Sequence, residues 1–323
     1  MAKLNSPLKS IVRTHPQVIA GLASHKSAGG QIAPGFKPAP ALDLKFRGGR
    51  TIPDLAFKSF YLGGASWADT DIQQIDAALS GAMADPHLNN VLLQYYPGRK
   101  AISSRFLGSE KLATTVGKTF TRDSVNPALS ALLAGGKLTG IDFDTTVICL
   151  FLPPGAVLDT RAAGGVGKDK DGDKPKARAK DKQVGDTDDE DTSKNGLGGY
   201  HGSAHVGATR IYFAVGVYSE NVGGKINGIP VWPDPWKNVV ATFYHELVEA
   251  RTDPDVEEST RANNDALLGW YSDKGGEIGD IPMSEAGAQI GLVMIEVKLA
   301  SGTTAPIQLM WSNSAHGPQG PFA

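Results

Sequence analysis

Hydrophobic positions in the first half of the chain follow first the period of a strand and then the period of a helix. The run LAFKSFYL at 55–62 is rich in aliphatic and aromatic residues and predicts a strand. After Asp69 or Thr70, either of which suits a helix N-cap, apolar residues recur every three or four positions up to Ala82. The same reasoning predicts helical segments over 88–96 and 126–133 and a fully buried strand over 145–152.

The second half of the chain carries the clearest strand and the clearest helix. The strand is RIYFAVGVY at 210–218. The helix is predicted to run from Pro235, with Asp234 at the N-cap, to about Thr252, because Pro254 disfavours helical backbone at the residue before it. Two late strands are predicted over 290–299 and 307–311. Together these elements predict an α/β (α+β) fold, in which helices pack a mixed β-sheet and a metalloprotease-like active-site helix follows a strand.

Composition divides the chain into three parts. Residues 1–50 mix Gly, Pro, Lys and Ala without a clear period and are interpreted as an N-terminal tail or arm. Residues 51–323 are interpreted as a single α/β domain, interrupted by a flexible charged insertion at 164–199. No aromatic residue occurs between Phe151 and Tyr200, so the insertion offers little apolar surface to bury.

Charge and hydropathy exclude several classes of partner. The chain has 32 basic and 34 acidic residues, and this balance gives no reason to expect nucleic acid. The longest apolar stretch, 147–158, is broken by two prolines and is too short to span a bilayer. Arg13 and His15 interrupt what would be the apolar region of a signal peptide, so the expected location is cytoplasmic, with leaderless export left open. Cys149, the only cysteine, lies in an apolar strand and is interpreted as a small hydrophobic residue.

The predicted helix at 235–252 contains the chemistry of greatest interest, in the sequence His245-Glu246-Leu-Val-Glu249. Residues four apart project from the same side of a helix, so His245 and Glu249 can bind one ion together. Glu246 lies about 100° further round the helix and suits a general base. This is the logic of H-E-x-x-H zinc hydrolases, with a glutamate in place of the second histidine. The alternative is that His245 and Glu249 form the solvated face of an amphipathic helix.

A third ligand must come from another segment, and GGEIGD at 275–280 is the preferred source. Glu277 and Asp280 are both candidate metal ligands, and three residues apart in a helical turn they would point the same way. One would bind the ion and the other would orient His245 through its second ring nitrogen. Asp280 is slightly preferred as the ligand because its short side chain has fewer rotatable bonds. His201 is interpreted as a hydrogen-bonded structural residue, but His201 or His205 is the next candidate ligand if this segment fails.

An ordered set of short motifs resembles the Exordium/phosphate-induced protein family. The set comprises GYHGSA at 199–204, the strand at 211–217, Trp-Pro at 232–233, the H-E-x-x-E helix, Thr-Asp-Pro at 252–254, Gly-Trp-Tyr at 269–271 and EIGD at 277–280. The resemblance extends over about 55–323. It implies a relation to proteins that are chiefly extracellular, plant-derived and linked to growth, with bacterial relatives, and it implies no settled biochemical activity. This chain departs from the plant pattern in having no signal peptide, no further cysteines and the charged insertion.

Two functions of different classes remain. The first is a zinc-dependent hydrolase of the peptidase kind, with one zinc ion, Glu246 as general base and a peptide or protein substrate paired with the strand at 210–218. The second is a non-catalytic binding protein with a structural metal site, which interacts with cell-wall carbohydrate or a protein partner. An open coordination position distinguishes them, because catalytic zinc retains a water whereas structural zinc is closed by four protein ligands.

Overall fold

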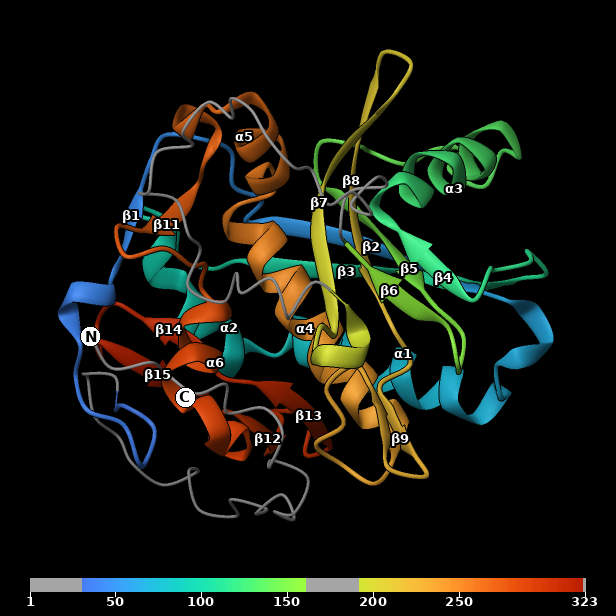
Figure 1. Cartoon of the computed structure of the whole chain (residues 1–323). Coiled ribbons are helices and arrows are strands. Elements are labelled where there is room, and N and C mark those ends of the chain that lie inside the picture. Colours follow the sequence, from blue (N-terminus) through green and yellow to red (C-terminus); the bar gives the residue numbers. More distant parts are fainter. Residues whose placement is uncertain (1–30, 161–191, 322–323) are drawn as a thin grey trace, which may run out of the picture.

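A computed structural model describes residues 31–160 and 192–321 of the chain. At its centre lies a five-stranded β-sheet, formed by β2 (Asp54–Leu62), β3 (Ser103–Leu112), β5 (Thr146–Phe151), β7 (Gly199–Val206) and β8 (Thr209–Gly216). In space their order is β3-β2-β5-β8-β7 (Figure 1). Four of the strands run parallel, and β7 pairs antiparallel with β8 at one edge. The sheet is therefore mixed, as predicted.

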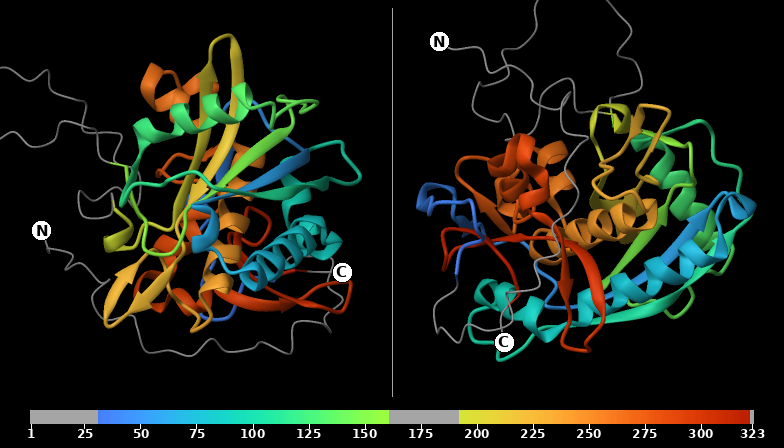
Figure 2. Two further views of the ribbon diagram at one scale, coloured as in Figure 1. Left: turned by 90° about the vertical axis from the view of Figure 1, so that its right-hand side faces the viewer. Right: turned by 90° about the horizontal axis from the view of Figure 1, so that it is seen from below.

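Helices cover both faces of this sheet (Figure 2). One face is packed by α1 (Asp69–Ala84) and α4 (Pro235–Thr252), which also contact each other. The other face is packed by α3 (Arg122–Ala134). The predicted α/β arrangement of helices on a mixed sheet is confirmed.

Strand β5 explains why the core has two halves. Val147, Cys149 and Phe151 belong to the hydrophobic cluster under α1 and α4, whereas Ile148 and Leu150 belong to the cluster under α3. Successive strand residues point to opposite faces, so a strand covered on both sides must be apolar at each position. Each residue of β5 is buried, as the run at 145–152 predicted.

The last quarter of the chain wraps around α4. A hairpin of β12 (Met294–Lys298) and β13 (Thr304–Gln308) packs on this helix, and α5 (Val256–Ala262) contacts β7. The remaining helices and strands are β1 (Leu44–Phe46), α2 (Pro86–Leu92), β4 (Thr119–Thr121), β6 (Val157–Asp159), β9 (Glu220–Val222), β10 (Lys225–Asn227), β11 (Trp270–Ser272), α6 (Asp280–Ala286), β14 (Met310–Ser312) and β15 (Gly317–Gln319). Short 3₁₀ helices are η3 (Pro40–Leu42), η4 (Gly64–Ser66), η5 (Leu93–Tyr95), η6 (Ser193–Asn195), η7 (Asp265–Leu267) and η8 (Gly287–Leu292).

The interpretation of 1–50 as a tail or arm is wrong for its second part. Residues 1–30 lie outside the described residues, but Leu44 is buried and β1 pairs antiparallel with β11. The partner strand is more than 200 positions away, which no local period can reveal. The predicted insertion at 164–199 also ends too late. Its residues 164–191 lie outside the described residues, but Ser193 is buried and bonds the Leu158 N–H, and β7 already begins at Gly199.

The predicted strand at 210–218 corresponds to β8, but β8 is not an edge strand. It lies between β5 and β7, and both of its neighbours pair with it, so it has no free edge for a substrate. The edge position next to α4 belongs to β7, which was not predicted as a strand because its small and polar residues lack a strand period. The predicted strand over 290–299 is also too long, because its first residues form η8.

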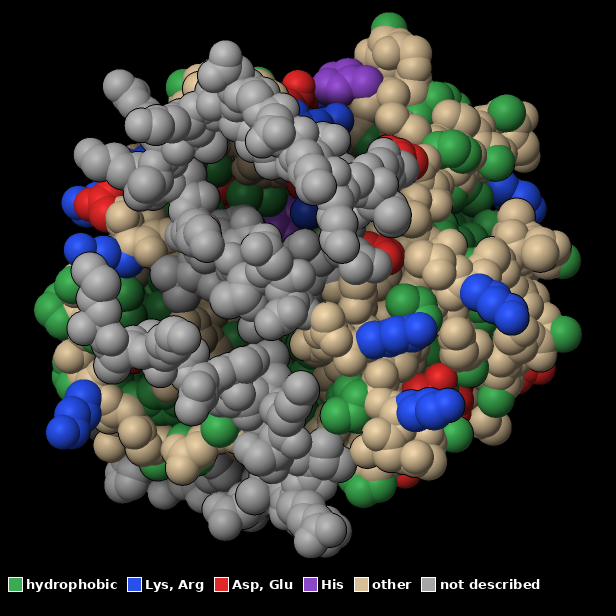
Figure 3. All heavy atoms as spheres, in the orientation of Figure 1, with side chains coloured by type: hydrophobic (Ala, Val, Ile, Leu, Met, Phe, Trp, Pro, Cys, Tyr) green, Lys and Arg blue, Asp and Glu red, His purple; other side chains and the backbone are tan. Residues whose placement is uncertain are grey.

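Surface features agree with the balanced composition. On the face drawn in Figure 3, basic side chains of the described residues lie scattered among acidic and apolar ones. In the part of the chain that the structure describes, no helix has the length and apolar character needed to cross a membrane.

The stacked rings that join α4 to the sheet provide a test of this core. Phe151 on β5 stacks between Tyr61 and Phe243, with ring centroids 4.5 and 3.7 Å away. We expect Phe151→Ala to lower the free energy of unfolding by about 3–5 kcal/mol, because it removes a buried ring and leaves a cavity. Urea unfolding measures the loss, and Phe46→Ala, at a ring that is 52% exposed, is the matched control that should change little. Equal effects of the two substitutions would contradict this packing.

Candidate metal centre

Helix α4 holds three of the predicted site residues, and it is buried on nearly every side. The helix begins at Pro235 and ends at Thr252, as predicted, although the side chain of Asp234 makes no cap hydrogen bond. Instead, the Asn238 side chain accepts the backbone N–H groups of Val231 and Trp232 and so fixes the turn before the helix. The side chains of His245 and Glu249 are only 14% and 3% exposed, so the alternative in which they form a solvated helix face is wrong. Glu246 is also buried, at 4% exposed. Buried carboxylates of this kind require partners.

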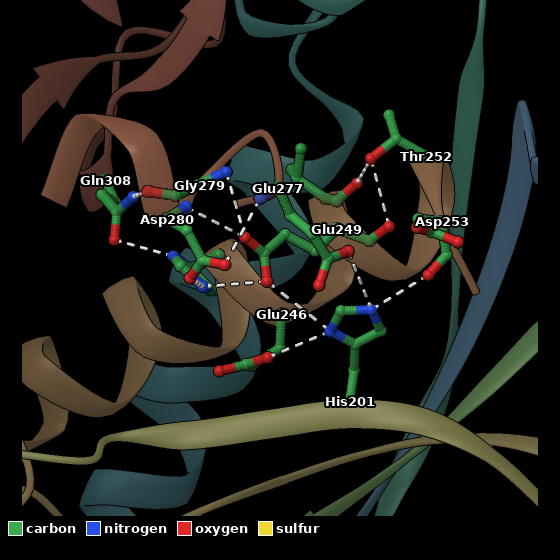
Figure 4. Close-up of polar contacts among 11 residues, drawn as sticks. His201, Glu246, Glu249, Thr252, Asp253, Glu277, Gly279, Asp280 and Gln308 are labelled. Atoms are coloured by element: carbon green, nitrogen blue, oxygen red, sulfur yellow. Dashed lines mark hydrogen bonds and ion pairs between the residues drawn. The ribbon is translucent and has the colours of Figure 1, made fainter. Parts of the chain in front are cut away.

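His201 approaches α4 from strand β7, and both of its ring nitrogens are occupied. Nε2 lies 3.1 Å from the backbone oxygen of Asp253, which can only accept, so Nε2 carries a hydrogen. Nδ1 faces two carboxylates, Glu246 Oε2 at 3.3 Å and Glu249 Oε2 at 3.6 Å (Figure 4). In the neutral ring Nδ1 is an acceptor, and an acceptor that faces two carboxylate oxygens needs a proton or a cation between them.

His245 shows the same arrangement on the other side of Glu249. Its Nδ1 lies 2.8 Å from Gln308 Oε1, and the Gln308 amide is oriented by its own bond to the backbone oxygen of Gly279 at 2.6 Å. Nδ1 of His245 therefore donates, and Nε2 is left to face Glu249 Oε2 at 2.9 Å and Asp280 Oδ1 at 3.8 Å. Metal-binding histidines are commonly oriented in this way, through a hydrogen bond from the second ring nitrogen.

The side chains form two groups that can each hold a metal ion. One comprises His201, Glu246 and Glu249, and the other comprises His245, Glu249 and Asp280. Within each group the ligand atoms lie within 4.8 Å of one another. Tetrahedral zinc with bonds of about 2.0–2.1 Å requires ligand atoms about 3.3 Å apart. The histidine nitrogens lie 2.9 to 3.8 Å from the carboxylate oxygens of their groups. Imidazole nitrogen and carboxylate oxygen are suitable zinc donors.

The segment before α6 brings Asp280 to the helix, as predicted, but gives Glu277 a different place. The backbone N–H groups of Gly279 and Asp280 both donate to Glu249 Oε1, at 3.0 and 3.1 Å. Glu277 belongs to neither metal-binding group, and its Oε1 lies 3.5 Å from Nε2 of His201. The expectation that Glu277 or Asp280 would orient His245 through its second ring nitrogen is wrong, because Gln308 does so. His205 is exposed and belongs to neither group.

Burial and mutual repulsion shift the pKa values of the carboxyl groups in this cluster. Burial, together with the charge of Glu249, raises the pKa of Asp280 to about 7. Burial also raises the pKa of Asp253 to about 7, although its hydrogen bond from Gly269 lowers it, and burial raises the pKa of Glu277 well above its usual value. Glu249 differs: burial would raise its pKa, but His245 and His201 together hold it below the usual range.

The two histidines respond to the same carboxylates. Burial by itself would lower the pKa of each imidazole. The charges of Glu277 and Glu249 and the hydrogen bond to Glu246 instead raise the pKa of His201 well above its usual value, and the charges of Glu249 and Glu246 do the same for His245. Without a metal ion, the cluster therefore retains protons to balance its negative charge.

One buried oxygen supports the view that the cluster suits a cation. Glu277 is 3% exposed, and its Oε1 has no hydrogen-bond partner. A carboxylate oxygen deprived of both water and a donor is costly unless positive charge lies close by. His201 lies between this oxygen and the carboxylates of α4, so positive charge on or beside the imidazole would compensate Glu277.

His201 is the residue that reasoning from sequence undervalued. Its flanking glycines were a usable signal, because they let β7 approach its neighbours closely. A Cβ on Gly199 would lie 3.1 Å from Glu246 Oε1, and one on Gly202 would lie 2.7 Å from Glu257 Oε2. A histidine between two such glycines therefore indicates a residue of a tightly packed site.

Comparison of the chain with models of known protein families, with curated proteins and with solved structures finds no match. The geometry of the described residues therefore carries the argument for this site.

The pKa shifts predict how pH affects the metal-free protein. Asp253 and Asp280 have a folded-state pKa of about 7 against a usual 3.8, so the folded state retains protons that the unfolded state loses. Their contribution to the free energy of unfolding is fully present below pH 3.8 and is lost as the pH rises through about 7. The raised pKa of both histidines acts in the same direction above 6.5, whereas the lowered pKa of Glu249 matters only below 4.5.

We therefore expect the unfolding free energy of chelator-treated protein to fall between about pH 5 and about pH 7. Urea unfolding at the two pH values measures the change. Asp280→Asn should make the pH dependence shallower, because it removes one titrating carboxyl. A metal-free protein that becomes more stable over this range would contradict the assigned shifts.

Gly279 provides a steric test of the site. A Cβ there would lie 2.5 Å from His245 Nδ1 and 2.9 Å from Glu249 Oε1, too close for ordinary contact. If the group holds a metal ion, we expect Gly279→Ala to weaken its binding by roughly 10–100-fold, measured with zinc as the probe, as losses of supporting contacts around metal ligands commonly do. Equilibrium dialysis measures the affinity. Gly117→Ala, where the nearest heavy atom is 3.5 Å from the new Cβ, should bind zinc as the unmodified protein does.

Proposed function

We propose that this protein is a zinc-dependent hydrolase of the peptidase kind, whose ion is bound by His245, Glu249 and Asp280. The main support for this proposal is the orientation of His245. Its Nδ1 donates to Gln308, so Nε2 is left to face the carboxylates of Glu249 and Asp280. Three protein ligands leave a fourth coordination position for water, as in catalytic zinc sites.

Solvent exposure favours the His245 group over the His201 group as the reactive site. The side chain of His245 is 14% exposed and that of Asp280 is 33% exposed, whereas the side chain of His201 is only 3% exposed. A substrate must reach the ion, so the reactive position belongs where the ligands meet solvent. The buried group is better suited to holding charge than to meeting a substrate.

Glu246 is the proposed general base. It follows His245 on the same helix, and its Oε2 faces His201 Nδ1 at 3.3 Å, which fixes the carboxylate. We assign proton transfer to Oε1, which takes a proton from the attacking water and returns it to the leaving amine. When bound, zinc supplies Lewis-acid chemistry, by acidifying water and polarising the carbonyl that is attacked.

A second function has one specific observation in its favour. His201, Glu246 and Glu249 are all buried, and an ion held only there would be structural. The chain would then be a non-catalytic, Exordium-like protein that binds cell-wall carbohydrate or a protein partner. The ordered motifs that resemble the Exordium/phosphate-induced protein family support this relation, and they imply no enzyme activity by themselves.

The substitution Glu246→Gln separates these functions. If Glu246 is the base, the variant should retain zinc at the His245 group, and hydrolysis of labelled casein should fall by a factor on the order of 100 or more. His245→Ala is the control that should lose both zinc and activity. If Glu246→Gln protein loses its zinc, or keeps full activity, Glu246 is not the base. If the unmodified protein binds zinc and hydrolyses nothing, the structural function stands.

A further inference from the structure

Glu249 belongs to both metal-binding groups, and the two histidines fall in different groups. Its Oε2 lies 2.9 Å from His245 Nε2 and 3.6 Å from His201 Nδ1. Its Oε1 is fixed separately by the N–H groups of Gly279 and Asp280. One carboxylate oxygen therefore lies close to an imidazole nitrogen of each histidine, and Figure 4 shows Glu249 and His201 turned toward each other.

The His201 group is built like a second site. Nε2 of His201 donates to the backbone oxygen of Asp253, which turns Nδ1 toward Glu246 Oε2 and Glu249 Oε2. The side chains of these three residues are 3–5% exposed, so water cannot replace the missing donor or cation freely. Glu277 Oε1 is buried and makes no hydrogen bond, and it lies 3.5 Å from Nε2 on the other edge of the same imidazole, so it also favours positive charge on or beside His201.

The formal charge of the cluster also favours positive charge beside these side chains. With neutral imidazoles, the carboxylates of Glu246, Glu249, Glu277 and Asp280 carry −4 in total, one from each. One divalent ion leaves −2, which the cluster can balance with retained protons or with a second divalent ion that displaces them. Asp253 lies beyond His201, and its Oδ1 accepts the Gly269 N–H. Uncompensated buried charge is strongly unfavourable, so the cluster favours a second cation when one is available.

We infer that His201, Glu246 and Glu249 bind a second divalent transition-metal ion, which inhibits the enzyme by taking its general base as a ligand. The inhibition rests on the proposed function, because only there does Glu246 act as the base. The kind of metal ion follows from the donor atoms, because one imidazole nitrogen and two carboxylate oxygens suit zinc.

The second ion should bind more weakly than the first. Glu249 belongs to both groups, so its carboxylate already binds the first ion when the second one binds. Two positive ions held by one carboxylate also repel each other. Zinc should therefore load the protein in two steps, first at the more accessible His245 group and then at the buried His201 group.

Zinc titration of the metal-free protein, measured by equilibrium dialysis, tests this inference. We expect two zinc ions per chain with separate affinities. His201→Asn should weaken the second step at least about 100-fold, beyond what loss of a supporting contact costs, and should retain the first. Glu246→Gln should do the same, which gives a second variant if His201→Asn folds poorly. His205→Asn, at an exposed histidine on the same strand, is the matched control and should retain both steps.

The outcomes separate the inference from the proposed function. A single zinc ion in the unmodified protein, or a second step that persists in both variants, overturns the second site and leaves the hydrolase proposal intact. Casein hydrolysis should fall over the zinc range in which the second step fills, and a rate unaffected by that step overturns the inhibition. Two zinc ions without hydrolysis at any zinc concentration would overturn the proposed function and leave the second site standing.

Discussion

The buried carboxylate of Glu249 is the interaction on which the site depends. Oε1 accepts two backbone N–H groups from the segment before α6, and Oε2 faces His245 on its own helix and His201 on β7. These contacts join three segments that are distant in sequence. Burial by itself would raise the pKa of Glu249, and the two histidines and the backbone donors more than offset that effect. The arrangement of the surrounding residues therefore follows from satisfying one buried charge.

Close approach of backbone to side chain makes this arrangement possible. Gly199 and Gly202 bring β7 against α4 and α5, and Gly279 brings the loop against His245 and Glu249. At each of the three positions a Cβ would come within 3.0 Å of a neighbouring atom. Glycine is required there for lack of space. The glycines at positions 199 and 202, on either side of Tyr200-His201, therefore let His201 come close to the helix.

The C-terminal end of α4 is fixed as firmly as the site itself. Arg251 is fully buried, and its guanidinium donates to Asn89 and to the backbone oxygen of Ser103. The backbone oxygen of Arg251 accepts from the Tyr96 hydroxyl and from the Ile52 N–H. Since Glu249 lies only two residues earlier, these bonds limit how far its carboxylate can move. A rigid helix with an anchored end suits a site that must hold several charges at fixed separations.

Much of the framework could be predicted from the sequence alone. The helical period and the prolines at 235 and 254 located the start and the approximate end of α4, and the four-residue spacing correctly placed His245 and Glu249 on one side of it. The uninterrupted apolar run at 145–152 identified a strand buried on both faces. These features depend on local backbone geometry, and hydrophobic periods report that geometry directly.

The completion of the site was decided by tertiary structure. The sequence could not establish that β7 forms the edge beside α4 or that His201 meets Glu246 from 45 positions away. It offered both Glu277 and Asp280 as candidate ligands, and the fold places Asp280 beside His245 and Glu277 beside His201. Strand order and the close approach of loops depend on how distant segments pack, and packing of this kind leaves no period in the sequence. The sequence therefore determined which helix carries the chemistry, and the tertiary structure decided which side chains surround it.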